Sequence, residues 1–176
     1  LEKQSAYEAV YRPSGQDLTF SLLGALGLIA GCVLSFRGSI AQMLVSLLGL
    51  LAGLSLGAGA VLRRKAKKPS AAFSVFVVLF YVAKLFRDFR HWEINPAILD
   101  YCLLLFAMIA FMLASYHAGA FSFERGARRR LAFYSLLGVL FGAISLAGAQ
   151  LPELLIYAGS VFWMLACAQQ MLRRSV

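Results

Sequence analysis

The sequence predicts an all-α polytopic membrane protein with six transmembrane helices and both termini in the cytoplasm. Of the 176 residues, 61% are hydrophobic and 14% are charged, whereas an ordinary soluble domain carries roughly 25% charged residues. The apolar residues also come in stretches close to the ~20 residues that a helix needs to cross a bilayer. Finally, connections rich in lysine and arginine alternate along the chain with connections that contain few of them.

The apolar stretches define six expected spans, joined by connections too short for a soluble domain. They are 18–36, 40–62, 71–91, 98–117, 131–149 and 153–172. We therefore expect one transmembrane domain over 1–176. The first two spans are separated only by Arg37 to Ser39, which is enough for a tight helical hairpin. The polar start lacks the basic-then-apolar layout of a secretory signal, so the first span is expected to remain in the mature protein.

The distribution of cations predicts the orientation. Thirteen of the 17 lysines and arginines fall on one side: before the first span, in 63–68, in 125–130 and in the tail. The other four are Arg37, Lys84, Arg87 and Arg90. Short cytoplasmic loops are enriched in cations, so the richer side is expected to be cytoplasmic, in a bacterial cytoplasmic membrane.

The net charge of +9 is concentrated in two juxtamembrane segments, "RRKAKK" and "GARRR". Basic residues beside a helix end attract anionic headgroups at roughly 1 kcal/mol each, so membrane lipids are the expected partners. A cytoplasmic partner subunit that docks on these loops is the alternative. Nucleic acid is not expected, since it requires a basic surface with stacking aromatics on a soluble platform.

Glycines recur at every fourth position in three of the expected spans. The runs are Gly27 and Gly31; Gly49, Gly53 and Gly57; and Gly138 and Gly142. This spacing lets helix backbones approach closely in lipid, so we expect packing within the chain, with homodimerisation as the alternative. Segments 46–62 and 135–151 also share ten identities in seventeen positions, as a three-plus-three inverted repeat would produce.

The stretch "KLFRDFRHWEINPAILDY", residues 84–101, carries the unusual chemistry of the chain. It joins the third and fourth spans on the side that is otherwise poor in cations. If the third helix continues to about His91, then Lys84, Arg87, Asp88 and His91 form one stripe on one face. Asn95 and Pro96 suit the start of the next helix, which places Asp100 one turn inside it as a partner for these cations.

Intramembrane ionisable groups are functional candidates, and a net-basic pocket lined by aromatics suits an anion. We therefore expect an outer-face site for a small anionic solute or a lipid headgroup, with Gln150 and Glu153 completing it. The alternative is an anchor, in which Lys84 reaches outward and the aromatics form an interfacial belt. The candidate binding residues are Lys84, Arg87, Asp88, Arg90, His91, Trp92, Asp100 and Tyr101.

Enzyme chemistry is poorly supported. The two histidines, His91 and His117, are expected at opposite membrane faces, so they cannot share a haem or a zinc ion. Three isolated cysteines form no metal or redox motif. We expect no cofactor and no catalytic residue. The sequence favours a ligand-binding membrane protein, such as a transport component, and the alternative is a non-catalytic subunit or sensor module. No motif identifies a family.

Overall fold

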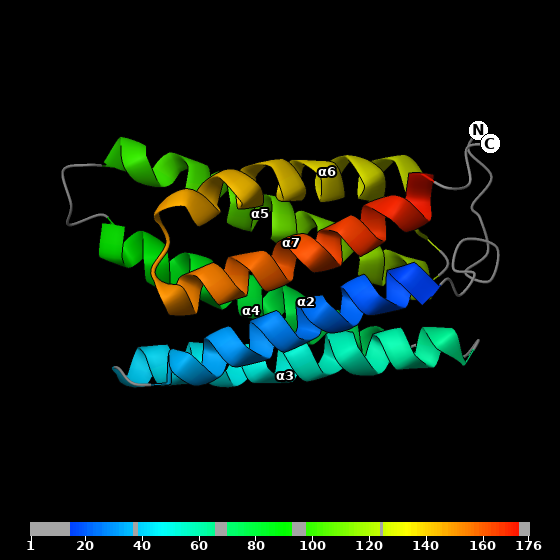
Figure 1. The fold of residues 1–176 in the computed structure, drawn as a ribbon, viewed down its shortest axis with the longest axis horizontal. Helices are drawn as coiled ribbons and strands as arrows, with labels where there is room; N and C mark the ends of the chain where they lie inside the picture. Colours follow the sequence, from blue (N-terminus) through cyan, green and yellow to red (C-terminus); the bar gives the residue numbers. More distant parts are fainter. Residues whose placement is uncertain (1–14, 37–38, 66–69, 93–97, 124, 173–176) are drawn as a thin grey trace.

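In the part of the chain that a computed structural model describes, six α-helices make up the bundle (Figure 1). The structure describes residues 15–36, 39–65, 70–92, 98–123 and 125–172. The helices are α2 (Gly15–Leu34), α3 (Ile40–Arg64), α4 (Ala71–Trp92), α5 (Ile98–Ala120), α6 (Arg128–Ser145) and α7 (Leu151–Leu172). Two short 3₁₀ turns, η1 (Phe121–Phe123) and η2 (Leu146–Gly148), follow α5 and α6. No strand occurs within the described ranges.

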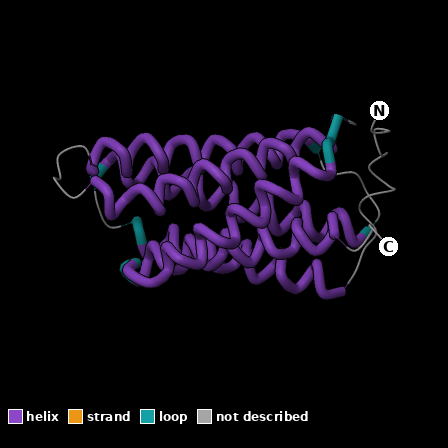
Figure 2. Tube along the Cα trace, turned by 90° about the horizontal axis from the view of Figure 1, so that it is seen from above, coloured by secondary structure: helices purple, strands orange, loops and turns teal. Residues whose placement is uncertain are grey.

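The helices lie side by side along the long axis and form a closed ring in chain order. Each helix packs on the next one along the chain, and α7 closes the ring against α2. Figures 1 and 2 show the same elongated bundle from two directions, with helix throughout its length. Short connections produce this order, because they force consecutive helices to be antiparallel neighbours.

Within the described residues, five helical segments are long and apolar enough to cross a membrane: Gly15–Leu34, Ile40–Arg64, Tyr101–Phe123, Arg128–Gly148 and Leu151–Leu172. Helix α4 has 22 residues, like α7, but its last nine positions include four charged residues. The outer surface of the ring is apolar, which is the surface that lipid solvates. The side chains that are more than half exposed include Leu26, Leu44, Leu54, Phe86, Phe133 and Leu140.

Helices α2 and α7 pack backbone against backbone. A Cβ atom added to Gly159 would lie 2.6 Å from the Leu28 nitrogen and 2.7 Å from the Gly24 oxygen. Gly27 and Gly31 also face α7, and Gly49 and Gly53 of α3 face side chains of α2. These glycine contacts are therefore made inside the chain, as the expected intramolecular packing requires.

An aromatic layer fills the middle of the ring. Phe80, Tyr81, Phe111 and Tyr157 are each at most 2% exposed, and neighbouring ring centroids lie 5.2 to 6.5 Å apart. The Tyr81 hydroxyl donates a hydrogen bond of 2.8 Å to Ser160 Oγ, which donates in turn to the Ile156 carbonyl at 2.8 Å. This layer separates the polar groups at the two ends of the bundle.

The helix ends differ from the expected spans by a few residues. Helix α5 continues to Ala120 rather than ending at His117, and α6 begins at Arg128 rather than Leu131. Both extensions are polar or small, so hydropathy did not include them. The tight connection after α2 leads to Ser39, whose hydroxyl caps α3 by accepting from the Gln42 amide. Residues 37 and 38 of that connection lie outside the described residues.

Candidate functional site at the charged end of helix α4

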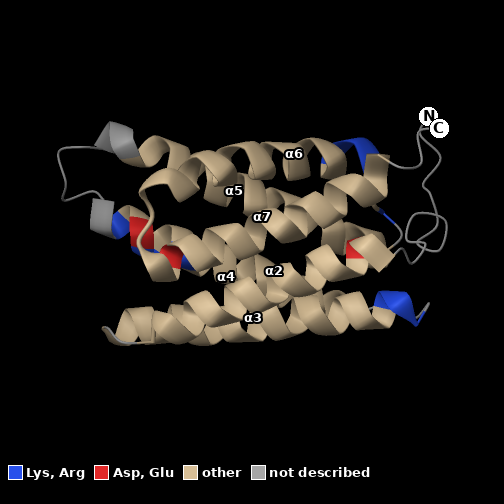
Figure 3. Ribbon diagram, viewed as in Figure 1, with Lys and Arg blue, Asp and Glu red and all other residues tan. Residues whose placement is uncertain are grey.

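Charged side chains gather at the two ends of the bundle and leave the long middle uncharged (Figure 3). One end holds Arg63 and Arg64 of α3 together with the arginines at the start of α6. The opposite end holds acidic and basic groups side by side. Its centre consists of Lys84, Arg87 and Asp88, which we call the α4 cluster.

Within the α4 cluster, Lys84 and Arg87 both contact the carboxylate of Asp88. Lys84 Nζ donates to Asp88 Oδ2 at 2.6 Å. Arg87 reaches the other oxygen, Oδ1, through Nη2 at 2.6 Å and through Nε at 2.8 Å. The i, i+4 spacing places Lys84 and Asp88 on one face of the helix, and Arg87 reaches the same carboxylate from the adjacent position. Two cations on a single carboxylate leave one net positive charge.

Lys84 lies inside the bundle rather than at its surface. Its side chain is 3% exposed, and its ammonium lies 5.5 Å from the centre of the Tyr157 ring. Along α4 it lies eight residues before the end at Trp92, about 12 Å at 1.5 Å per residue. The interpretation in which Lys84 reaches outward to solvent is therefore wrong. A charge at this depth requires a partner, which Asp88 supplies.

A cavity of about 220 Å³ opens beside the cluster. Side chains of α2, α3, α4 and α7 line it, with Lys84 and Arg87 on one wall and Glu153 on another. The remaining polar lining groups are Cys32, Ser35, Gln42, Ser46 and Gln150. Mixed charged and neutral polar groups in an otherwise apolar bundle are typical of a small-molecule site.

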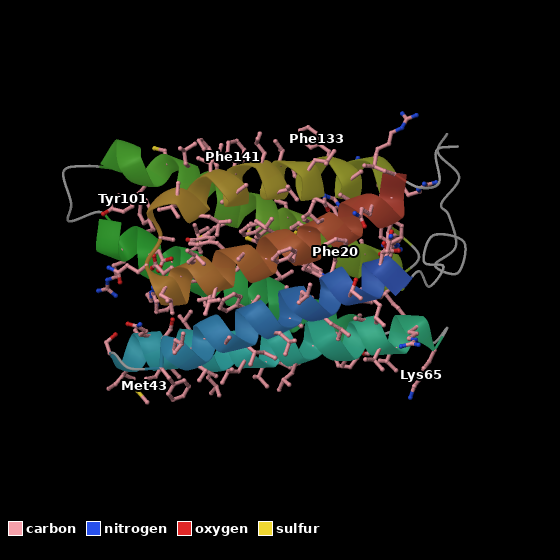
Figure 4. All side chains as sticks on the ribbon, viewed as in Figure 1. Phe20, Met43, Lys65, Tyr101, Phe133 and Phe141 are labelled. Atoms are coloured by element: carbon pink, nitrogen blue, oxygen red, sulfur yellow. The ribbon has the colours of Figure 1, made fainter. Side chains whose placement is uncertain are left out.

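A wider groove of about 1520 Å³ lies at the same end of the bundle. It shares Gln42, Arg87, Gln150 and Glu153 with the cavity, so a solute in the groove can contact the groups that bound the cavity. Gln150 and Glu153 thus lie at this end, as the sequence predicted. Figure 4 labels Tyr101 and Met43 at this end and Lys65 at the other.

The candidate residues divide into three groups. Lys84, Arg87 and Asp88 come together in the cluster. Arg90 is exposed, and it lines the groove together with the half-buried Tyr101. The side chains of His91, Trp92 and Asp100 lie outside the described residues. Asp88 of the same helix pairs with Lys84 and Arg87, and the pairing expected of Asp100 stays a prediction.

Sequence reasoning missed the opposite wall of the site. Tyr157 packs under Lys84, and Cys32, Ser35, Gln42 and Ser46 line the cavity. One signal was available, because Glu153, Tyr157 and Ser160 are spaced at i, i+4 and i+7 and therefore share a face of α7. The polar residues of α2 and α3 gave no such stripe.

The basic end shows structural roles for some of its cations. Arg128 Nη2 donates to the Met171 carbonyl at 2.7 Å, near the end of α7, where carbonyls lack helical partners. His117 stacks on Tyr134 with centroids 5.2 Å apart. In the described residues, no three His, Cys, Asp or Glu side chains are grouped so that they could hold a metal ion, and all three cysteines are free thiols.

The fold and the apolar outer surface place the chain in the class of helical integral membrane proteins. No family model, curated protein or solved structure matches it. What the chain does therefore has to be inferred from the geometry of the α4 cluster and the cavity beside it.

Proposed function

We propose that the protein binds a small solute bearing a carboxylate or phosphate group, or a lipid headgroup of that chemistry, in the cavity beside the α4 cluster. The observation that carries this proposal is the pair of cations on one buried carboxylate. Lys84 has three N–H donors and Arg87 has five. Asp88 occupies part of this set, and the remaining donors are available to an anionic group in the cavity.

The energetics support an anion at this position. Charge-assisted hydrogen bonds from lysine and arginine to carboxylate or phosphate are among the strongest in proteins. A low-dielectric surrounding strengthens them, and the cavity lies among buried apolar side chains such as Phe80 and Ile156. By the positive-inside rule, the basic end belongs in the cytoplasm, so the cavity faces outward, as a capture site of a transport component in a bacterial cytoplasmic membrane would.

The direct test is native mass spectrometry of the protein in mild detergent, comparing wild type with Arg87→Ala. We expect a bound mass in the wild type that is lost in the variant. The fold should survive, because Lys84 still pairs with Asp88. Arg64→Ala, at the opposite end, is the matched control and should retain the bound mass. The same mass in all three proteins would contradict the proposal.

A non-catalytic subunit or sensor module remains the second candidate. The exposed side chains of Arg64, Lys65, Arg129 and Arg130 at one end favour it, because they offer a cationic surface. Charge reversal of Arg64 and Lys65 should then release a partner protein in pull-downs, while Arg87→Ala should not.

A further inference from the structure

The charged side chains that line the cavity define the class of ligand more narrowly than anions in general. Glu153 of α7 lines both the cavity and the groove. Its side chain is half-buried, and in the described part of the chain no hydrogen bond or ion pair holds its carboxylate. An acidic group therefore faces the same space as Lys84 and Arg87.

The balance of charges follows from these contacts. Lys84 and Arg87 carry two positive charges, and Asp88 neutralises one of them. Glu153 supplies a second negative charge, so the charges of the α4 cluster and Glu153 sum to zero. A ligand with only a negative charge would meet the net positive cluster but would also lie near an uncompensated carboxylate, and a like charge at short range is unfavourable.

Glu153 lies close along α7 to the residue that Lys84 contacts. It lies in the first turn of α7, where the helix dipole favours a carboxylate. Tyr157 follows four residues later, about 6 Å along the helix axis, and the Lys84 ammonium lies against its ring. The Lys84 ammonium thus lies against the residue one helical turn beyond Glu153 on α7.

We propose that the ligand is a small zwitterion, with an anionic group on Lys84 and Arg87 and an ammonium group on Glu153. This inference rests on the proposed function of the same site. An amino acid carries a carboxylate and an ammonium a few bonds apart, and an aminophospholipid headgroup carries a phosphate and an ammonium in the same way, so each can present both charges to one cavity. A cavity of about 220 Å³ is below the roughly 300 Å³ or more of pockets for drug-sized ligands, which agrees with a solute of this size.

The test uses probes that differ by one charged group. Phosphoethanolamine and β-alanine carry both charges, ethyl phosphate and propionate lack the ammonium, and ethanolamine lacks the anion. Binding is measured by calorimetry and by thermal shift in a detergent that carries no aminolipid. We expect a zwitterion to bind roughly tenfold or more tightly than its one-charge analogues, because each loses a hydrogen bond between charged groups.

Glu153→Gln gives the decisive comparison, since it preserves size and removes the charge. In this variant the zwitterion and its anionic analogue should bind equally. Arg64→Gln, remote from the cavity, should behave as the wild type does. The zwitterion could be a lipid headgroup or a free solute. Reconstitution into nanodiscs of phosphatidylglycerol with and without phosphatidylethanolamine distinguishes these two sources. A thermal shift from the aminolipid that Glu153→Gln abolishes would indicate the headgroup, and a shift from the soluble zwitterion alone would indicate a free solute.

Failure of this inference is distinguishable from failure of the proposed function. If ethyl phosphate binds the wild type as tightly as phosphoethanolamine, and Glu153→Gln changes neither affinity, the zwitterion assignment is wrong and the anion site stands. If no probe and no lipid binds, the binding function itself is overturned.

Discussion

Asp88 is the residue on which the charged site depends, because its two oxygens satisfy two different cations. Sequence spacing was enough to place Lys84, Arg87 and Asp88 on one face of α4, and the structure confirms this. It did not predict that Asp88 itself pairs with both cations, because the expected partner was Asp100, whose side chain lies outside the described residues. A carboxylate four residues away on the same helix requires no particular packing of a neighbouring helix, whereas Asp100 would require a defined register between α4 and α5.

Asp88→Asn should destabilise the protein strongly. The change leaves the buried Lys84 ammonium without its counter-charge, and breaking a buried pair by removing one partner costs about 3–5 kcal/mol. We expect a loss near the low end of this range in the free energy of unfolding, because Arg87 is 27% exposed and can turn toward solvent.

A double variant separates charge from packing in this prediction. Adding Lys84→Met to Asp88→Asn removes both members of the buried pair, so most of the lost stability should return. Unfolding in mixed detergent, followed by circular dichroism, measures both variants. Arg90→Gln, on an exposed position of the same helix, should change the free energy of unfolding by about 0.5 kcal/mol or less. Equal losses in the single and double variants would show that the ion pair is not the source of the stability.

At the scale of helices, the presence and approximate ends of all six could be predicted, but the faces that turn inward could not. In a soluble helix, an apolar stripe marks the buried face. In this chain nearly every position of a helix is apolar, so the pattern does not distinguish lipid from core. The glycine positions were more informative than hydropathy, because the glycines of α2 and α3 lie on the faces that contact neighbouring helices. In α7 the polar spacing of Glu153, Tyr157 and Ser160 was a weaker indication of the inward face, and the position of Tyr157 beneath Lys84 was not predicted.

The contact between α2 and α7 should be sensitive to a single methyl group. In Gly159→Ala, the new Cβ would meet backbone atoms of Leu28 and Gly24 at 2.6 and 2.7 Å, and backbone cannot move aside as a flexible side chain can. Overpacking of this kind typically costs about 1–3 kcal/mol. We expect a lower melting temperature in detergent, measured by intrinsic fluorescence.

Gly57→Ala is the matched control for this substitution. A Cβ at Gly57 would lie 3.7 Å from the Ala25 Cβ, which is ordinary van der Waals contact, and alanine favours a helix over glycine by up to about 1 kcal/mol. Its melting temperature should equal or exceed that of the wild type. If both variants melt alike, close backbone approach does not control the packing of α2 on α7.

At the scale of the whole molecule, the ring gives α3 and α6 equivalent places, each as the middle helix of three. Gly49 of α3 faces Cys32 of α2 and Phe80 of α4, and Gly138 of α6 faces Phe111 of α5 and Met164 of α7. These are equivalent positions in the two similar sequence segments. The arrangement agrees with an inverted repeat, which stays a prediction, since any closed ring of six helices in chain order would also give it.

The closed ring also determines which conformational change a transport cycle would require. The cavity lies on one side of the aromatic layer, and a smaller cavity of about 30 Å³, lined by Ser55, Ser115 and Trp163, lies on the basic side. Buried aromatic side chains close the space between them. A transport cycle would therefore require this layer to open, whereas a binding or sensing function would leave it closed.

Orientation in the membrane decides which compartment supplies the ligand. We propose that the charged end of α4 faces outward, and cysteine labelling tests this in a variant whose three native cysteines are replaced by alanine. Arg90 and Lys65 are exposed and lie at opposite ends of the bundle. Arg90→Cys should react with a membrane-impermeant maleimide in intact cells, and Lys65→Cys should react only after permeabilisation.

The two ways in which this labelling can fail have different meanings. The reverse pattern would keep the six helices but place the cavity toward the cytoplasm, so the protein would sample an internal solute or the inner leaflet. Labelling of both positions from one side would mean that α4 does not cross the membrane. That result would have a physical explanation, because α4 is the helix with the most charge in its second half. We nevertheless expect α4 to cross the membrane, because the carboxylate of Asp88 pairs with two of its cations.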